Sequence, residues 1–172
     1  MHILIVGISF SGKSNFAKSL AAQQSRVIVF DPLKSSGWPS HAQKYSDPEH
    51  FLKVISTAQN AHVFVDESKM LWDANPKEAD KLLYNRRHQG LLIYLIAQRT
   101  NMIPPNGRNM CSRVFAFKQQ KFDADILAQE KTEEFRQLPR IEKNHFIGSD
   151  GFNTSFYSLD YSNGLPPKII SN

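Results

Sequence analysis

The chain has one cysteine in 172 residues, Cys111, and it has no long apolar run. A single cysteine excludes an internal disulfide, and no paired Cys or Cys/His spacing suggests a zinc site. No run approaches the roughly 20 apolar residues of a membrane-spanning helix, and the first residues lack the charged-then-apolar pattern of a signal peptide. We therefore expect a protein of a reducing cytoplasm, with no transmembrane segment.

Acidic residues are in the minority, because 21 Lys and Arg face 16 Asp and Glu, which gives a formal net charge of +5. A basic balance suits a polyanionic partner, although composition alone is a weak signal for nucleic acid. The length and the 41% of hydrophobic residues are ordinary for one globular core. We expect a single domain over residues 1–172, with a core over about 1–130 and a C-terminal extension over about 131–172.

The sequence GISFSGKS at residues 7–14 fits the P-loop pattern of two glycines, separated by four residues, followed by Lys and Ser. An apolar run precedes it at residues 3–6, and apolar residues at helical spacing follow it at 16–21. In a strand–loop–helix unit, backbone N–H groups and the helix N-terminus bind phosphate. The pattern predicts that ATP is bound by Gly7, Ser9, Phe10, Ser11, Gly12, Lys13, Ser14 and Asn15.

A second motif supports the first. The apolar run His62–Val65 ends in Asp66 and Glu67, as in a Walker B element. We expect Lys13 to reach the β- and γ-phosphates, and Ser14 and Asp66 to hold Mg²⁺. Glu67 can accept a proton from a water molecule aligned on the γ-phosphate. A strand that ends in two acids can also simply be exposed to solvent, but the P-loop upstream favours catalysis.

Three more residues are catalytic candidates. Gln98 follows the continuous apolar run Leu91–Ile96, where it can hydrogen-bond the attacking water or merely close a loop. Arg86 and Arg87 end a predicted helix, where the helix dipole favours arginine. The functional alternative is an arginine finger, which would reach the nucleotide of a neighbouring subunit.

The segment 100–112 is rich in proline, glycine and asparagine, which predicts a flexible loop. Arg99, Arg108 and Arg113 lie in or beside it. Arginines on a mobile loop beside a nucleotide can contact the DNA backbone, although charged loops are usually just solvated. We expect these three residues to be the DNA-binding set.

The remaining segments give weaker signals. Residues 33–46 read as a loop, and Asp123 reads as a capping residue at the start of a helix. Runs at 141–147 and 155–159, separated by turn residues, predict a β-hairpin. The tail from Pro166 onward is expected to be loose.

Taken together, these motifs resemble the FtsK–HerA superfamily of DNA-pumping ATPases, and the small size resembles the compact genome-packaging ATPases of membrane-containing and related viruses. The resemblance covers roughly residues 1–130. It rests on residues 7–14, 63–67, RRHQG at 86–90, 93–98, and SRVFAF at 112–117. The resemblance implies a RecA-like core, a ring of subunits, expected to be a hexamer, and ATP-driven movement of double-stranded DNA. It also makes Arg113 a third candidate for the arginine finger.

These observations predict a three-layer α/β fold of the RecA-like P-loop NTPase class, with a mostly parallel central sheet and a short C-terminal β-hairpin. The expected function is an ATP- and Mg²⁺-dependent double-stranded DNA translocase that packages a viral genome into a preformed capsid. The expected setting is the host cytoplasm or the virion, with capsid vertex proteins as partners. No DNA-reading C-terminal domain or membrane anchor of the FtsK pumps is expected, which weakens a role in chromosome segregation.

Two other functions remain open. One is a small-molecule kinase of the nucleoside monophosphate or shikimate kinase type, which has this length and an N-terminal P-loop. Glu67 argues against it, because a kinase excludes water, and an arginine-rich lid is missing. The other is an assembly protein that is gated by the nucleotide without useful turnover.

Overall fold

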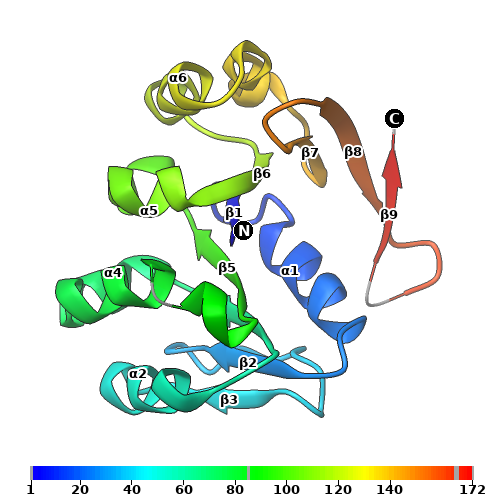
Figure 1. Ribbon diagram of the computed structural model, residues 1–172. Helices are drawn as coiled ribbons and strands as arrows, with labels where there is room; N and C mark the ends of the chain where they lie inside the picture. Colours follow the sequence, from blue (N-terminus) through cyan, green and yellow to red (C-terminus); the bar gives the residue numbers. More distant parts are fainter. Residues whose placement is uncertain (1, 85, 165–166, 172) are drawn as a thin grey trace.

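The computed structural model describes residues 2–84, 86–164 and 167–171. Within these residues the strands are β1 His2–Val6, β2 Val27–Phe30, β3 Gln43–Tyr45, β4 His62–Val65, β5 Leu92–Ala97, β6 Cys111–Phe117, β7 His145–Ser149, β8 Thr154–Asp160 and β9 Lys168–Ser171. They form one sheet in the order β3-β2-β4-β5-β1-β6-β7-β8-β9 (Figure 1). Strands β1 to β6 pair in parallel, and β7 to β9 are antiparallel. The predicted mostly parallel α/β sheet is confirmed.

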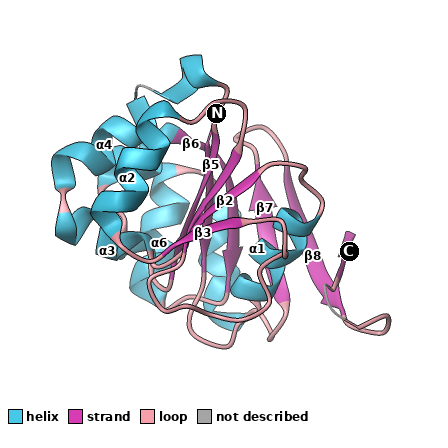
Figure 2. Ribbon diagram, turned by 90° about the horizontal axis from the view of Figure 1, so that it is seen from below, coloured by secondary structure: helices cyan, strands magenta, loops and turns pink. Residues whose placement is uncertain are grey.

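Helices cover both faces of this sheet (Figure 2). The α-helices are α1 Lys13–Ala22, α2 Pro48–Thr57, α3 Ser68–Ala74, α4 Pro76–Tyr84, α5 Pro105–Met110 and α6 Lys121–Glu130, and the 3-10 helices are η1 Arg86–Gln89, η2 Thr100–Met102 and η3 Glu133–Arg140. Helix α1 lies on one face, and α2 to α6 lie on the other (Figures 1 and 2). In the described part of the chain, no helix has the length and apolarity needed to cross a membrane.

The alternation of side chains along the strands builds two cores. On β1, Leu4 and Val6 belong to the core under α2 to α6, whereas Ile3 and Ile5 belong to the core under α1. All four are at most 5% exposed. Because successive residues of a strand point to opposite faces, a strand covered on both faces must be apolar throughout. This explains the uninterrupted apolar runs in the sequence.

The antiparallel strands curl around α1 (Figure 1). Phe146 of β7 packs against Phe16 of α1, with ring centroids 4.7 Å apart. On the same helix, the Ser19 hydroxyl donates to the Pro167 carbonyl over 2.9 Å. The predicted hairpin is therefore confirmed as β7 and β8, but the expectation of a loose tail is wrong from Lys168 to Ser171, because this segment pairs with β8 as a further strand.

Two predicted loops contain regular structure. Residues 33–46 include β3, which pairs with β2 at the sheet edge, and residues 100–112 include η2 and α5. These elements are too short to show a periodic pattern, so only their tertiary contacts reveal them. Asp123 is no helix cap either. Its side chain is fully buried and accepts hydrogen bonds from Arg99 Nε and the Asn101 backbone N–H, at 2.9 and 3.1 Å.

Candidate nucleotide-binding site

The P-loop, the predicted Walker B residues and Gln98 all follow strands at the same edge of the sheet. We call the edge where the parallel strands end the carboxyl edge, and the edge where they begin the amino edge. The P-loop follows β1, Asp66 and Glu67 follow β4, and Gln98 follows β5, which lies between β4 and β1. Loops at the carboxyl edge of such a sheet are the usual place for a ligand.

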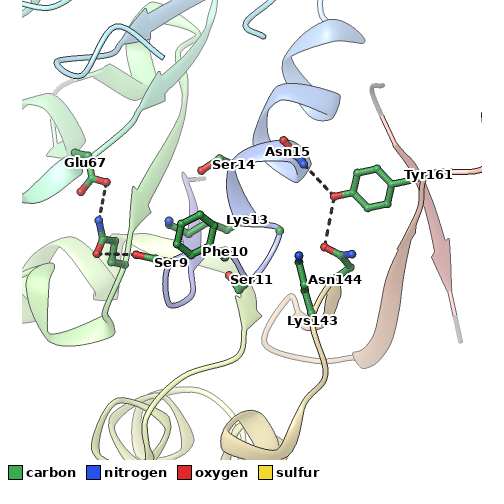
Figure 3. A pocket seen from close by; sticks show the side chains of 12 residues that line it. Ser9, Phe10, Ser11, Lys13, Ser14, Asn15, Glu67, Lys143, Asn144 and Tyr161 are labelled. Carbon is green, nitrogen blue, oxygen red and sulfur yellow. Dashed lines mark hydrogen bonds between the residues drawn. The ribbon is translucent and has the colours of Figure 1, made fainter. Parts of the chain in front are cut away.

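These loops enclose a cavity of about 570 Å³ (Figure 3). It is lined by Ser9, Phe10, Ser11, Gly12, Lys13, Ser14, Asn15, Glu67, Gln98, Lys143, Asn144 and Tyr161. The structure therefore brings seven of the eight predicted nucleotide-binding residues to one cavity together with Glu67 and Gln98. The eighth, Gly7, lies at the base of the loop, where a Cβ atom would stand 2.6 Å from Phe117 Cβ.

The backbone of the P-loop requires its second glycine. Gly12 has a φ of 105°, and a Cβ atom there would lie 2.8 Å from Asn144 Oδ1. Phe10 also has a positive φ, of 63°, and its side chain is 90% exposed. Left-handed residues in such a turn are a feature of backbone nests that bind anions. The loop thus combines a nest with the N-terminus of α1, which begins at Lys13.

Lys13 is nearly buried, with 7% of its surface exposed. Burial lowers the pKa of its ammonium group, and the nearby negative charges of Asp66 and Glu67 act in the opposite direction. Among the described contacts, this ammonium has no hydrogen-bond or ion-pair partner. A buried cation without a partner, on the wall of a cavity, is suited to bind an anionic group such as phosphate.

Asp66 and Ser14 supply oxygen atoms near this lysine. Burial raises the pKa of Asp66, whereas the hydrogen bond that its Oδ1 accepts from the Glu67 backbone N–H, at 3.0 Å, lowers it. One carboxylate and one hydroxyl fit Mg²⁺, which completes its shell with phosphate and water oxygens. Among the described residues, no three His, Cys, Asp or Glu side chains gather into a metal site of their own.

A chain of hydrogen bonds joins Glu67 to the P-loop (Figure 3). Gln98 Nε2 donates to Glu67 Oε1 over 3.0 Å, and Ser9 Oγ donates to Gln98 Oε1 over 3.3 Å. Glu67 itself has a φ of 48°, in the left-handed region that is rare for glutamate. Strained backbone of this kind is frequent at functional sites. Gln98 therefore holds the carboxylate that is expected to act on water.

Sequence reasoning missed one wall of the cavity, which the C-terminal extension provides. Lys143, Asn144 and Tyr161 line it, and the Asn144 backbone N–H donates to the Ser11 carbonyl over 3.0 Å. The Tyr161 hydroxyl accepts from Asn15 Nδ2 at 3.1 Å and lies 3.5 Å from Asn144 Oδ1. No motif marks these residues, because they reach the P-loop only through the curl of β7 and β8 around α1.

The predicted arginines are not gathered at the cavity. The side chains of Arg86 and Arg87 lie outside the described residues, although their backbone forms η1. Arg108 is 6% exposed, and its guanidinium donates to both carboxylate oxygens of Glu130 over 2.8 and 2.5 Å. This pairing ties α5 to α6, so we withdraw Arg108 from the DNA-binding set. A guanidinium group that is almost fully buried and paired with a carboxylate is poorly placed to contact a DNA backbone.

The other two arginines lie at opposite edges of the sheet. Arg99 follows β5 at the carboxyl edge and donates through Nε to Asp123, with its side chain 37% exposed. Arg113 is exposed on β6, where it is paired in register with Ile3 near the start of β1, close to the amino edge. Arg99 and Arg113 flank the segment 100–112 in the sequence, but they lie at opposite edges of the sheet and so do not gather on one side of the cavity.

No protein-family model matches the sequence, and no curated protein matches it. Among solved structures, the genome packaging NTPase B204 from Sulfolobus turreted icosahedral virus 2, in complex with AMPPCP, matches with a TM-score of 0.71 at 17% identity, over 90% of this chain and 95% of that one. The pCW3 conjugation coupling protein TcpA matches with a TM-score of 0.75 at 15% identity, over 96% of this chain and 62% of that one.

The chain has a P-loop NTPase fold. The N-terminal domain of zonular occludens toxin from Neisseria meningitidis also matches, with a TM-score of 0.61 at 18% identity over 92% of this chain and 94% of that one. The predicted α/β fold of the P-loop NTPase class is thus confirmed. The match to B204 also extends beyond residue 130, since it covers 90% of the chain.

Proposed function

We propose that this chain is an ATP-driven double-stranded DNA translocase that packages a viral genome into a preformed capsid. The observation that carries the proposal is the meeting of the P-loop, Glu67 and Gln98 at one cavity, with Asp66 close enough to Lys13 for its charge to act on the ammonium group. The fold supports the biological setting, because it is shared with a genome packaging NTPase over 90% of this chain and 95% of that one.

The residues divide the chemistry among them. Lys13 and the P-loop amides bind the β- and γ-phosphates, and Ser14 and Asp66 hold the Mg²⁺ ion that accompanies the nucleotide. When bound, this ion shields the negative charge of the phosphates. Glu67 accepts a proton from the attacking water, and the Gln98 amide orients Glu67 and senses the γ-phosphate.

An arginine finger would come from a second copy of the chain. The cavity lining contains no arginine among the described residues. Arg113 lies near the amino edge. The short helix η1, which contains Arg86 and Arg87, directly precedes β5 at the same edge. In a head-to-tail ring, one surface of each subunit meets a different surface of the next. We therefore infer a homo-oligomeric ring, a hexamer, in which one of these arginines reaches the neighbouring nucleotide.

The ring would move DNA through contacts with its phosphates. Arg99 is the proposed contact at the carboxyl edge, beside Gln98, and Arg113 is a candidate for either DNA or the neighbouring nucleotide. Phosphate contacts carry no sequence information, so binding should be insensitive to sequence and should weaken steeply with salt. Such a motor would act in the host cytoplasm or on the virion, docked to capsid vertex proteins.

The test is ATP hydrolysis by the purified protein, with and without double-stranded DNA, together with its mass in solution. A translocase should form a ring-sized species whose hydrolysis rises with DNA. Glu67→Gln should lower hydrolysis by roughly 10²- to 10⁴-fold, as expected for the loss of a general base, and should leave ATP binding intact. Glu49→Gln, at an exposed glutamate in the first turn of α2, is the matched control and should change neither property.

Other outcomes would favour other functions. Transfer of phosphate to a small acceptor, with hydrolysis little affected by Glu67→Gln, would indicate a kinase. ATP binding with almost no turnover, with or without DNA, would indicate a nucleotide-gated assembly protein. Either result would overturn the proposed translocase.

A further inference from the structure

The cavity has two different walls on either side of the P-loop (Figure 3). One wall carries Glu67 and Gln98, the residues proposed to act at the γ-phosphate. The opposite wall carries Asn144 and Tyr161 from the C-terminal extension, with Lys143 beside them. If the phosphates lie along the P-loop with the γ-phosphate at Glu67, then the α-phosphate is farthest from Glu67. The ribose and base attached to it must then extend toward the wall of the C-terminal extension.

This wall is held firmly against the P-loop. The Asn144 backbone N–H donates to the Ser11 carbonyl over 3.0 Å, and its own carbonyl accepts from the Leu159 N–H over 2.9 Å. Asn144 adopts a left-handed φ of 64°, which asparagine tolerates better than most residues. Its backbone is therefore fixed between the P-loop and β8, and its carboxamide is presented to the cavity.

Tyr161 completes the wall with an aromatic ring and a hydroxyl group. The ring packs against the core under α1 and is half-buried. Its hydroxyl accepts from Asn15 Nδ2 at 3.1 Å, but it lies 3.5 Å from Asn144 Oδ1, at the long limit for a hydrogen bond. Among the described contacts, Asn144 Nδ2 has no acceptor. The wall thus offers an apolar surface together with polar groups that are incompletely paired.

We propose that Tyr161 and Asn144 form the nucleoside subsite of the nucleotide cavity and bind the ribose and base of a nucleoside triphosphate. This inference rests on the proposed function for the orientation of the phosphates. An aromatic side chain offers contact area to a planar base, and the phenol and carboxamide can both donate to and accept from ribose hydroxyls or base edges. A few polar groups on a partly apolar wall are the usual makeup of a small-molecule site.

The test compares two ligands that differ only in the nucleoside, namely MgATP and magnesium tripolyphosphate, by titration calorimetry. In the wild-type protein, MgATP should bind more tightly than tripolyphosphate. Tyr161→Ala should weaken MgATP at least tenfold and leave tripolyphosphate within about twofold. Tyr84→Ala, at an exposed tyrosine that ends α4, is the matched control and should change neither affinity.

A second variant distinguishes the loss of the subsite from a loss of affinity that is caused by misfolding. Tyr161→Phe keeps the ring and its packing and removes only the hydroxyl, so it should weaken MgATP about threefold and leave tripolyphosphate unchanged. Equal losses for both ligands, or no loss for either, would overturn the subsite.

The subsite and the motor can fail separately. A wild-type protein that binds MgATP but does not hydrolyse it would contradict the proposed translocase. The comparison of MgATP with tripolyphosphate would still test the nucleoside subsite. Hydrolysis stimulated by DNA, with MgATP affinity unchanged in both Tyr161 variants, would contradict the subsite alone. A wild-type protein that binds neither ligand would contradict both.

Discussion

At the scale of single residues, Gly12 is constrained in two independent ways. Its φ of 105° disfavours any side chain, and a Cβ atom there would lie 2.8 Å from Asn144 Oδ1 and 3.2 Å from Leu159 Cδ1. Gly151 has a φ of 89°, but a Cβ atom at that position would have no neighbour within 4 Å among the described residues. The two glycines therefore separate the cost of the backbone conformation from the cost of the steric clash.

We expect Gly151→Ala to lower the free energy of unfolding by about 1 kcal/mol, from the backbone alone. Gly12→Ala should cost about 1–3 kcal/mol more, because the added methyl group must displace Asn144 or Leu159. Thermal unfolding of the two variants, measured side by side, checks this difference. Equal losses would show that the C-terminal extension does not press on the P-loop.

Site residues could be predicted from the sequence where they belong to a motif of neighbouring positions. Lys13 and Glu67 could be assigned because P-loop and Walker B spacings are local, and Gln98 because it ends an apolar run. Asn144 and Tyr161 could not be assigned, since they belong to the site only through strand curling and long-range hydrogen bonds.

At the scale of secondary-structure elements, one ion pair joins α5 to α6. Arg108 donates to Glu130 through two nitrogens, and its third donor contact, to the Ile103 carbonyl, is 2.5 Å long. Removing one partner of a mostly buried pair leaves the other without compensation. Arg108→Met should therefore lower the free energy of unfolding by about 3 kcal/mol, whereas the double change with Glu130→Met should cost less.

The matched control is the exposed pair Lys69 and Asp73, in which both side chains are at least 50% exposed. Lys69→Met should cost no more than about 0.5 kcal/mol, because solvent screens such pairs. Denaturant unfolding of the three variants measures these differences. A similar small loss for Arg108→Met and Lys69→Met would mean that the Arg108 pair is effectively solvated, which would return Arg108 to the candidates for DNA contact.

The short elements also mark the limit of sequence prediction at this scale. Strands β1, β4 and β5 could be predicted because burial on both faces leaves continuous apolar runs. Strand β3 has only three residues, none of them buried, so no pattern distinguishes it from a loop. Helix α5 begins with Pro105 and contains Gly107, which favour a turn locally, and its contacts with α6 and Trp72 decide its structure.

At the scale of the whole molecule, the sheet separates the cavity from the arginines that are proposed as fingers. The cavity lies at the carboxyl edge, and Arg113 lies near the amino edge. The short helix η1, which contains Arg86 and Arg87, comes just before β5 at the amino edge. A subunit with this polarity cannot easily bring its own amino-edge arginine to its own P-loop, because the sheet lies between them. The proposed ring resolves this separation by placing one subunit's amino edge against the next subunit's cavity.

Mixed rings test this arrangement directly. Rings of Glu67→Gln alone lack the general base, and rings of Arg113→Ala alone should lose roughly 10³- to 10⁵-fold in turnover if Arg113 is the finger. In an equimolar mixture, an Arg113→Ala subunit keeps Glu67, and a Glu67→Gln neighbour supplies Arg113. With random assembly, about a quarter of the interfaces, a half multiplied by a half, would hold both intact groups.

Mixing should therefore restore DNA-stimulated hydrolysis well above the level of either variant alone. The same experiment with Arg86→Ala and with Arg87→Ala identifies which of the three arginines acts across the interface. Replacing the true finger should abolish turnover in rings of that variant alone, and mixing with Glu67→Gln subunits should restore it. Measuring the mass of the mixture confirms that subunits have exchanged. If an arginine variant is inactive and an exchanged mixture stays inactive, that arginine acts within its own subunit, and a head-to-tail ring with this edge at the interface is wrong.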